Sequence, residues 1–363
     1  MADRPQSLTA PIWYRHLGDL PEAAFCHTPA WARIVREVWG GEAGAVLHPT
    51  PDGQQALLPL VSRRLARGWL QSSVSGETGV YGGPLLPQPM AAGAWPAFWR
   101  DLQRRHGSMT LFIPPGVAWS PPSHGEAIRR QTHRLILGES SLEAGYSRGL
   151  RAKLNRARRQ GIRIEAGTDA AAVAVYEGLY RDTLVRWGDG TSWERPTHFY
   201  EALLRHGAPS VRLWLAWLDD QPIAGIWVAT FRKQVHYLAG ATAPAGLAVG
   251  GSHLLLDHAL RQAAAEGGTV FDFGASGDRP GLIQFKQGFG ATPVPYGEIR
   301  LWQPAVRMYW YFKQRLAAAS PVPASLAAAS PVPSSLAGAS LAGASLAAPS
   351  QEPTGPAFEK VTC

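Results

Sequence analysis

The alternation of hydrophobic and polar positions is clearest in the second half of the chain. Apolar residues at spacings of three and four follow Thr168 and Asp169, either of which can cap a helix. The inward face of this helix comprises Val173, Tyr176, Tyr180, Thr183, Leu184 and Trp187. A second helix follows, and three short apolar runs at 211–219, 223–231 and 235–242 then predict an antiparallel meander.

The same half continues with two further pairs of elements. A helix over 252–266 is followed by a strand at 269–274. A short helix begins at Pro280, because proline is favoured in the first helical turn, and 293–302 forms the last strand. The predicted order is therefore helix, helix, three strands, helix, strand, helix, strand.

A weaker version of this order occurs in the first half. Thr28 and Pro29 begin a helix, and Asp52 with Gly53 forms the turn of a hairpin. The other expected elements are strands at 44–50, 55–64, 69–75 and 108–115 and a helix through Trp95, Phe98, Trp99 and Leu102. We infer a degenerate duplication of one domain.

Length and composition fit two domains and a tail. The chain has 363 residues, of which 45% are hydrophobic, enough to build two cores. We place the first domain at 1–141 and the second at 142–315. From residue 316 the sequence becomes a repeat rich in Ala, Ser and Pro, so 316–363 is predicted to be a disordered tail.

Cysteine usage and apolar run length indicate the compartment. Cys26 and Cys363 lie near opposite ends, which excludes a disulfide framework and a CxxC metal pair. The 11 histidines are scattered without ligand spacing, so no metal site is expected. Neither a signal peptide nor an apolar run of about 18 residues is present. We expect a cytoplasmic protein.

The charge suggests an anionic partner. The formal net charge is +8, and seven Lys and Arg residues fall within 148–163. A nucleic acid, a nucleotide-linked substrate or a lipid surface would each satisfy this charge.

Four segments resemble the Fem-like aminoacyltransferase branch of the GNAT acyltransferase superfamily. They are HTPAWARIVREVWG, SVSGETGVYGGPLLP, SRGLRAKLNRARRQGIRIE and FDFGASGDRPGLIQFKQGFGATPVPY, and the last two are the most specific. The resemblance covers residues 27 to about 296. It implies an α/β fold of the α+β type, with two tandem GNAT-like domains whose mixed, mainly antiparallel sheets are flanked by helices. The reaction site is expected in the second domain.

The resemblance makes Lys286 the main catalytic candidate. The lysine of this motif is implied to stabilise the tetrahedral intermediate or the donor's phosphate end, where negative charge must be balanced. The alternative is a surface lysine on an amphipathic helix. Asp272 ends a strand beside Gly274, where its carboxylate could accept the amine's proton, orient Lys286 or fix the turn.

Three further residues are candidates for substrate binding. Arg279 lies in the loop before the Lys286 helix, where it is either a phosphate clamp or a solvated charge. Tyr237 fits the family's YLxGA pattern and either binds substrate or packs in the core. Trp187 borders a loop that could cover the acceptor.

The basic segment at 148–163 predicts a helix with one packed face. At about 100° per residue, Tyr146, Leu150, Leu154 and Ala157 share one stripe, and the arginines lie outside it. We expect Arg148, Arg151 and Arg156 to bind phosphates of a nucleotide or a tRNA backbone, the alternative being a solvated basic helix.

Another segment, 307–316, is rich in aromatic and basic residues and suits either a membrane interface or a packed terminal helix.

Together these features predict an aminoacyltransferase without a cofactor. Its expected donor is aminoacyl-tRNA and its acceptor an anionic nucleotide-linked or lipid-linked peptidoglycan precursor. The first alternative is an acyl-CoA-dependent N-acyltransferase of envelope or exopolysaccharide assembly, with acetyl-CoA or another acyl-CoA as donor. However, 243–253 lacks the leading Gln or Arg of the usual CoA pyrophosphate loop. The second alternative is a non-catalytic binding module. We expect a monomer, with possible peripheral contact with the inner membrane on its cytoplasmic face.

Overall fold

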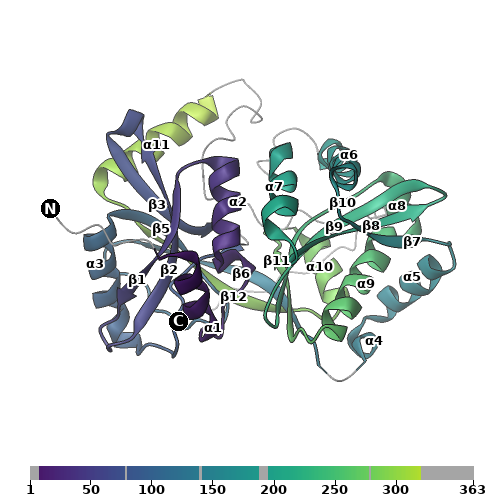
Figure 1. Cartoon of the computed structure of the whole chain (residues 1–363), viewed down its shortest axis with the longest axis horizontal. Coiled ribbons are helices and arrows are strands. Elements are labelled where there is room, and N and C mark those ends of the chain that lie inside the picture. The colour runs from purple at the N-terminus through teal and green to yellow at the C-terminus, as the bar shows by residue number, and fades with distance from the viewer. Residues whose placement is uncertain (1–7, 78–79, 139–140, 188–194, 278, 320–363) are drawn as a thin grey trace, which may run out of the picture.

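The computed structural model describes residues 8–77, 80–138, 141–187, 195–277 and 279–319 (Figure 1). The helices are α1 (Ala10–Gly18), α2 (Pro29–Trp39), α3 (Trp95–His106), α4 (Leu142–Gly145), α5 (Arg148–Arg158), α6 (Ala170–Trp187), α7 (Thr197–Gly207), α8 (Pro244–Val249), α9 (Gly251–Ala265), α10 (Pro280–Gly288) and α11 (Pro304–Ala319). The strands are β1 (Glu42–Pro49), β2 (Gln55–Leu65), β3 (Leu70–Glu77), β4 (Val80–Tyr81), β5 (Ser108–Ile113), β6 (Glu126–Ile136), β7 (Arg163–Gly167), β8 (Val211–Leu218), β9 (Gln221–Phe231), β10 (Gln234–Thr242), β11 (Val270–Ala275) and β12 (Thr292–Leu301).

The strands join in one sheet whose two halves repeat the same plan. The order is β1-β2-β3-β5-β12-β6-β11-β10-β9-β8-β7, and β4 pairs with β3. In the first half the β1-β2-β3 meander is followed by α3 and by β5, which is parallel to β3. In the second half the β8-β9-β10 meander is followed by α8, α9 and β11, which is parallel to β10. The mixed, mainly antiparallel sheet and the repeated plan predicted from the sequence are confirmed.

The two halves exchange strands at the centre of the sheet. β6 follows the first half in the chain but pairs antiparallel with β11, and β12 follows β11 but pairs antiparallel with β5. β6 and β12 also pair with each other over 126–134 and 292–300. The sheet therefore runs on past residue 141, where the sequence analysis placed a domain boundary, and that boundary remains a prediction.

Helices cover both faces of the second half (Figure 1). α6 and α7 pack on one face together with α2, and their core is aromatic, with Tyr176, Tyr200 and Trp227 fully buried. α5, α9 and α10 cover the other face around Phe271 and Phe289. Each fully buried side chain of this size contributes about 2–3 kcal/mol relative to an exposed one.

Most predicted helix starts are confirmed by their capping contacts. The Thr28 side chain accepts a hydrogen bond from the Trp31 backbone N–H at the start of α2. Of the two residues proposed to cap α6, Asp169 does so, because its Oδ1 accepts from the Ala172 N–H. Pro280 occupies the first turn of α10.

Two predictions need correction. No strand was expected at β6, whose centre carries the polar residues Thr132, His133 and Arg134 rather than an apolar run. The tail was expected to begin at residue 316, but α11 continues to Ala319. The rest of that segment, 320–363, lies outside the described residues.

Candidate active site

Strand β11 separates from its neighbours at the FDFG sequence. Its parallel pairing with β10 ends where His236 lies opposite Asp272, and its pairing with β6 is interrupted between Asp272 and Ala275. Gly274 lies in this interruption with a φ of +71°, which side chains rarely tolerate. The turn leaves the carbonyls of Gly274 and Ala275 available to a donor from outside the sheet.

The carboxylate of Asp272 is buried and hydrogen-bonded on both oxygens. Its Oδ1 accepts from Thr132 Oγ1 at 2.7 Å, from the Gly274 N–H at 2.8 Å and from Tyr81 OH at 3.3 Å. Its Oδ2 accepts from Arg134 Nε at 2.8 Å. No bond joins Asp272 to Lys286 among the described contacts. The geometry matches the role in which Asp272 fixes the turn.

The neighbours of Asp272 keep its carboxyl ionised. Burial acts to raise the pKa of this carboxyl, but the charges of Arg134 and His236 and the hydrogen bonds from Arg134 and Thr132 together hold that pKa below its usual value. Arg134 also donates to Glu22 Oε2 at 3.3 Å and to the Pro115 carbonyl at 3.2 Å. Asp272 is therefore an anionic anchor that ties β11 to β6 and to the first half of the chain.

Lys286 is buried, which excludes the alternative of a surface lysine. Only 2% of its surface is exposed. Its Nζ donates to the carbonyl of Gly274 at 2.6 Å and to that of Ala275 at 3.0 Å. The helix α10 thus directs this side chain at the two carbonyls that the turn of β11 leaves free.

Burial shifts the ionisation of Lys286 into the neutral range. Loss of hydration lowers its pKa to about 7, against an opposing effect of the nearby Asp272 charge. Both protonation states are therefore populated near neutral pH. Perturbed groups of this kind are typical of functional sites.

His133 joins Lys286 on this side of the sheet and was not predicted. It is 1% exposed, its Nδ1 lies 3.3 Å from Ser276 Oγ, and its Nε2 has no hydrogen-bond partner among the described residues. Burial, and then the charge of Lys286, lower its pKa to about 4, so the ring is neutral at pH 7. Only a prediction of strand β6 could have drawn attention to it.

The YGGP segment of the first half positions Tyr81 against Asp272. The Gly82 N–H donates to the Phe112 carbonyl at 2.8 Å, and the Gly83 N–H donates to Ser75 Oγ at 2.9 Å. A Cβ on Gly82 would lie 2.1 Å from the Ser75 carbonyl carbon, well inside contact distance. Glycine is therefore required here, and the site draws on both halves of the chain.

The basic helix α5 begins beside the helix that carries Lys286. The Ser147 N–H donates to the Gly288 carbonyl at 2.8 Å, and the rings of Tyr146 and Phe289 meet edge to face at 5.4 Å. As predicted, Tyr146, Leu150, Leu154 and Ala157 are buried.

The arginines of α5 differ in their contacts. Arg158 pairs with Glu143 at 2.8 Å and with the buried Asp257 at 3.0 Å, which holds the helix in place. Arg148, Arg151 and Arg156 are exposed, and none of them has an ion pair within the described part of the chain. The three residues predicted to bind phosphate are therefore exposed on α5, and the N-terminal end of this helix contacts α10.

The remaining candidates lie at different depths. Tyr237 is 6% exposed, packs in the core with Val235, and has a hydroxyl without a hydrogen-bond partner among the described residues. Arg279 precedes α10 and is partly buried, and burial lowers its pKa. Trp187 ends α6, but its side chain lies outside the described residues, as do 188–194 and Asp278.

The segment that would form a CoA pyrophosphate loop is helical. Residues 244–249 form α8, which ends at Gly250 in the left-handed conformation with a φ of +75°, and α9 begins directly after it. A Cβ on Gly250 would lie 3.7 Å from Ala157 Cβ of α5. The basic helix therefore lies against the junction of α8 and α9.

The described residues include neither a cluster of metal ligands nor a membrane-spanning helix. Within the ranges that the structure covers, no three His, Cys, Asp or Glu side chains gather as metal ligands. None of the helices described has the length and hydropathy needed to cross a membrane.

Comparisons with known proteins identify the fold. The sequence of residues 144–287 matches the family model of the acetyltransferase (GNAT) domain. The whole fold is similar to that of FemX, with a TM-score of 0.61 at 12% identity over 81% of this chain and 97% of that one. It is also similar to the C-terminal domain of a putative lysylphosphatidylglycerol synthetase from Agrobacterium fabrum, with a TM-score of 0.50 at 12% identity over 84% and 96% of the two chains. The fold is also similar to that of a conserved protein of unknown function from Bacteroides thetaiotaomicron. The TM-score is 0.54 at 8% identity over 82% of this chain and 99% of that one. No curated protein sequence matches.

These findings define the class of protein. The chain contains a GNAT domain and has the fold of acyl-transfer proteins. Within that class, its two-half arrangement is similar in fold to FemX. The resemblance drawn from the four sequence segments is confirmed.

Proposed function

We propose that the chain is an aminoacyltransferase, which moves an aminoacyl group from aminoacyl-tRNA to an amine of a peptidoglycan precursor. The observation that carries this proposal is the placement of Lys286. It is a buried amine with a pKa of about 7, held by the carbonyls of Gly274 and Ala275, and it lies beside the basic helix α5.

The reaction explains why such an amine is needed. The acceptor nitrogen attacks the ester carbonyl carbon, a C–N bond forms, the C–O bond to the tRNA ribose breaks, and the amine's proton passes to the leaving oxygen. Negative charge develops on the carbonyl oxygen before that bond breaks. A protonated Lys286 has three N–H donors, two of which bond to Gly274 and Ala275. The third is left for the developing oxyanion.

The neutral ring of His133 supports the same chemistry. Its unpartnered Nε2 can accept a hydrogen bond, because burial lowers the pKa of this side chain to about 4 and keeps the ring neutral. Ser276 fixes the ring through Nδ1. We assign His133 a positioning role toward Lys286 in the proposed reaction.

The exposed arginines of α5 support a phosphate-bearing substrate. Arg148, Arg151 and Arg156 suit the tRNA backbone or the pyrophosphate of a nucleotide-linked precursor. The name of the Agrobacterium fabrum relative joins an amino acid to an anionic phospholipid. A lipid-linked acceptor therefore fits the same proposal. The reaction would take place in the cytoplasm, where tRNA is aminoacylated.

The conformation of 243–253 favours tRNA over CoA as the donor. A CoA pyrophosphate normally binds the free N–H groups of a glycine-rich loop before a helix. Here that position is taken by α8, and the leading Gln or Arg is absent. An acyl-CoA donor remains the second candidate, because α9 still begins after two consecutive glycines, Gly250 and Gly251.

The central test replaces Lys286. Purified full chain is assayed with aminoacyl-tRNA bearing labelled amino acids and a UDP-linked muropeptide. Lys286→Met should lower turnover by about 10²–10³-fold, as loss of an oxyanion donor does. The matched control is Lys233→Met, which removes an exposed lysine of the β9–β10 turn and should leave turnover unchanged. Full turnover of Lys286→Met would refute the catalytic role of Lys286, whereas absence of turnover in the unaltered chain would favour a non-catalytic binding module.

A second measurement decides the donor. A ligand that binds only the folded state raises the melting temperature in a saturable manner. We expect such a rise with the UDP-linked muropeptide and none with acetyl-CoA. A saturable rise with acetyl-CoA would replace the tRNA-dependent reaction by an acyl-CoA-dependent one.

A further inference from the structure

The outer face of α11 is apolar although it faces solvent. Met308, Tyr311 and Phe312 are 58%, 51% and 54% exposed. The opposite face of the helix, which includes Val306 and Trp310, is buried against the sheet. The helix therefore does not need its exposed aromatic residues for folding, because its packing is provided by the other face.

The β2–β3 turn exposes a third aromatic residue. Trp69 is 88% exposed, the largest value among the exposed apolar side chains. It follows a tight turn in which Ala66, Arg67 and Gly68 all have positive φ. Trp69 therefore makes little contribution to the core.

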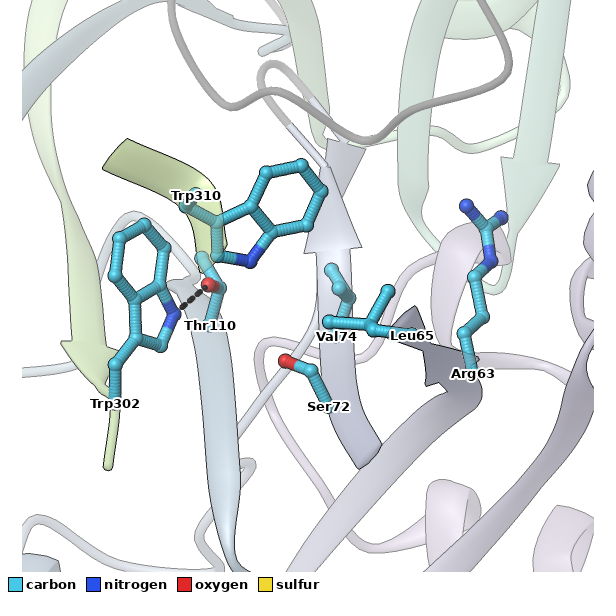
Figure 2. Close-up of a pocket in the computed structure, with 7 residues that line it drawn as sticks. All are labelled: Arg63, Leu65, Ser72, Val74, Thr110, Trp302 and Trp310. Carbon is cyan, nitrogen blue, oxygen red and sulfur yellow. Dashed lines mark hydrogen bonds between the residues drawn. The ribbon is translucent and has the colours of Figure 1, made fainter. Parts of the chain in front are cut away.

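A shallow pocket shows that the end of β2 next to this turn lies beside α11 (Figure 2). Arg63 and Leu65 of β2 line it on one side, and Trp302 and Trp310 line it on the other. Figure 2 shows Trp310 above the sheet and the bond from Trp302 Nε1 to Thr110 Oγ1, which is 3.0 Å long. We name the four exposed residues of this turn and of α11 the aromatic edge: Trp69, Met308, Tyr311 and Phe312.

The two segments that carry the aromatic edge have cationic side chains and no acidic ones. Residues 63–72 and 304–319 include no Asp or Glu. They carry the cations Arg63, Arg64, Arg67, Arg307, Lys313 and Arg315. Arg307 is matched by Glu126 at 3.9 Å, and Arg315 lies over the Tyr311 ring at 5.2 Å.

We propose that the aromatic edge docks on the surface of an anionic phospholipid bilayer. Tryptophan and tyrosine favour the interfacial region, and Arg and Lys reach from it to the lipid phosphates. A second copy of this chain fits poorly, since a symmetric contact would bring two sets of cations together. Because no described helix can span a membrane, the contact would be peripheral. This inference does not depend on the proposed reaction.

The test measures co-flotation of the full chain with vesicles. The protein should float with vesicles of phosphatidylcholine and phosphatidylglycerol, and much less with phosphatidylcholine alone. Trp69→Ala/Tyr311→Ala/Phe312→Ala should weaken this partition by about tenfold or more, because it removes most of the apolar contact. The matched control is Ile136→Ala/Val185→Ala, which removes exposed apolar side chains from other elements, 71% and 82% exposed. This control should bind as the unaltered chain does.

A charge comparison separates docking from general attraction to anions. Arg64→Gln/Arg67→Gln/Arg315→Gln should weaken vesicle binding more than Arg148→Gln/Arg151→Gln/Arg156→Gln, which removes the same charge from α5. Equal losses in the two variants would overturn the proposal. So would failure of the unaltered chain to float, or the same partition for the aromatic variant and its control. A dimer in light scattering that the aromatic variant abolishes would instead assign this surface to a second copy.

Brominated lipids give an independent readout. They quench only tryptophans that enter the bilayer, so they should quench the unaltered chain more than Trp69→Phe. Equal quenching in these two proteins would place Trp69 outside the bilayer and contradict the proposal.

Discussion

Arg134 donates a hydrogen bond of 2.8 Å to the carboxylate of Asp272, although 138 residues separate the two in the sequence. The bond crosses from β6 to β11 at the point where β11 turns away from its neighbours. It therefore links the first half of the chain to the turn that supplies the carbonyl partners of Lys286. The negative charge of Asp272 therefore stabilises the connection between β6 and β11.

The first prediction concerns Asp272→Asn. Removing the buried carboxylate leaves Arg134 with only its longer contact to Glu22 at 3.3 Å, so we expect a loss of up to about 3–5 kcal/mol in the free energy of unfolding. Urea denaturation followed by circular dichroism measures it. Asp220→Asn is the control, since Asp220 is 98% exposed and its loss should change stability by less than about 0.5 kcal/mol. A similar small effect of Asp272→Asn would contradict the anchoring role.

The difference in stability between the unaltered chain and Asp272→Asn should change with pH in one direction. The pKa of Asp272 is lower in the folded chain than in the unfolded chain. Its stabilising contribution is therefore fully present above about pH 4 and is lost as the pH falls through the folded pKa. The stability gap between the unaltered chain and Asp272→Asn should be constant from pH 5 to 7 and should narrow in more acidic solution.

The second prediction concerns stability on the alkaline side. In the folded chain the pKa of Lys286 is about 7, whereas an unfolded lysine titrates near 10.5. Between these values the unfolded state binds the additional proton, so stability should rise with pH from 7 to about 10, by a few kcal/mol at most. Urea denaturation at pH 7, 8 and 9 measures this rise. Lys286→Met should remove the part of this rise in stability that comes from the lysine. An unchanged rise in the variant would mean that other groups cause it.

The third prediction concerns how the protonation of Lys286 affects activity. If protonated Lys286 stabilises the oxyanion, its contribution declines as the pH rises through about 7 in the free enzyme. We expect the ratio of kcat/KM between the unaltered chain and Lys286→Met to fall from pH 6 to 9. Taking the ratio cancels the ionisation of the acceptor amine, which affects both proteins equally. A ratio independent of pH would mean that the lysine acts without its charge.

The repeated fold could be predicted because its signals are local. The apolar stripes of α3 and α6 and the meander of β8, β9 and β10 each follow from spacing within one element. β6 gave no such signal, since its central position is stabilised by polar partners far away in the sequence. Thr132 and Arg134 bond to Asp272, and His133 bonds to Ser276.

Part of the candidate site could also be predicted, because some of its signals lie within a single element. The helix with Lys286 was placed from its proline and its motif, and the packed stripe of α5 from its period. The burial of Lys286 depends on the turn at Gly274, which only the three-dimensional course of β11 reveals. The roles considered for Asp272 could not be separated without the position of Arg134.

The fourth prediction tests the glycine that holds Tyr81 near Asp272. A methyl group on Gly82 would meet the backbone of Ser75 at 2.1 Å, and backbone atoms cannot move aside as a flexible side chain does. Gly82→Ala should therefore destabilise the chain by about 2–4 kcal/mol. Gly93→Ala is the control, because a Cβ there has no atom within 4 Å. Thermal unfolding of both variants measures the difference, and equal melting temperatures would show that the close approach at Gly82 is relaxed in solution.

The last prediction concerns the exposed arginines of α5. If Arg148, Arg151 and Arg156 contact tRNA phosphates, each contact releases counterions and adds about 0.7–0.9 to the slope of log K against log salt. The triple change to Gln should weaken tRNA binding and lower that slope by about 2–3. Arg36→Gln/Arg100→Gln/Arg181→Gln removes the same charge from exposed positions on α2, α3 and α6 and should leave the slope nearly unchanged. Fluorescence anisotropy at several salt concentrations gives both slopes. Equal decreases would mean that net charge alone attracts tRNA, whereas a decrease confined to the α5 variant would place the phosphates beside the helix that carries Lys286.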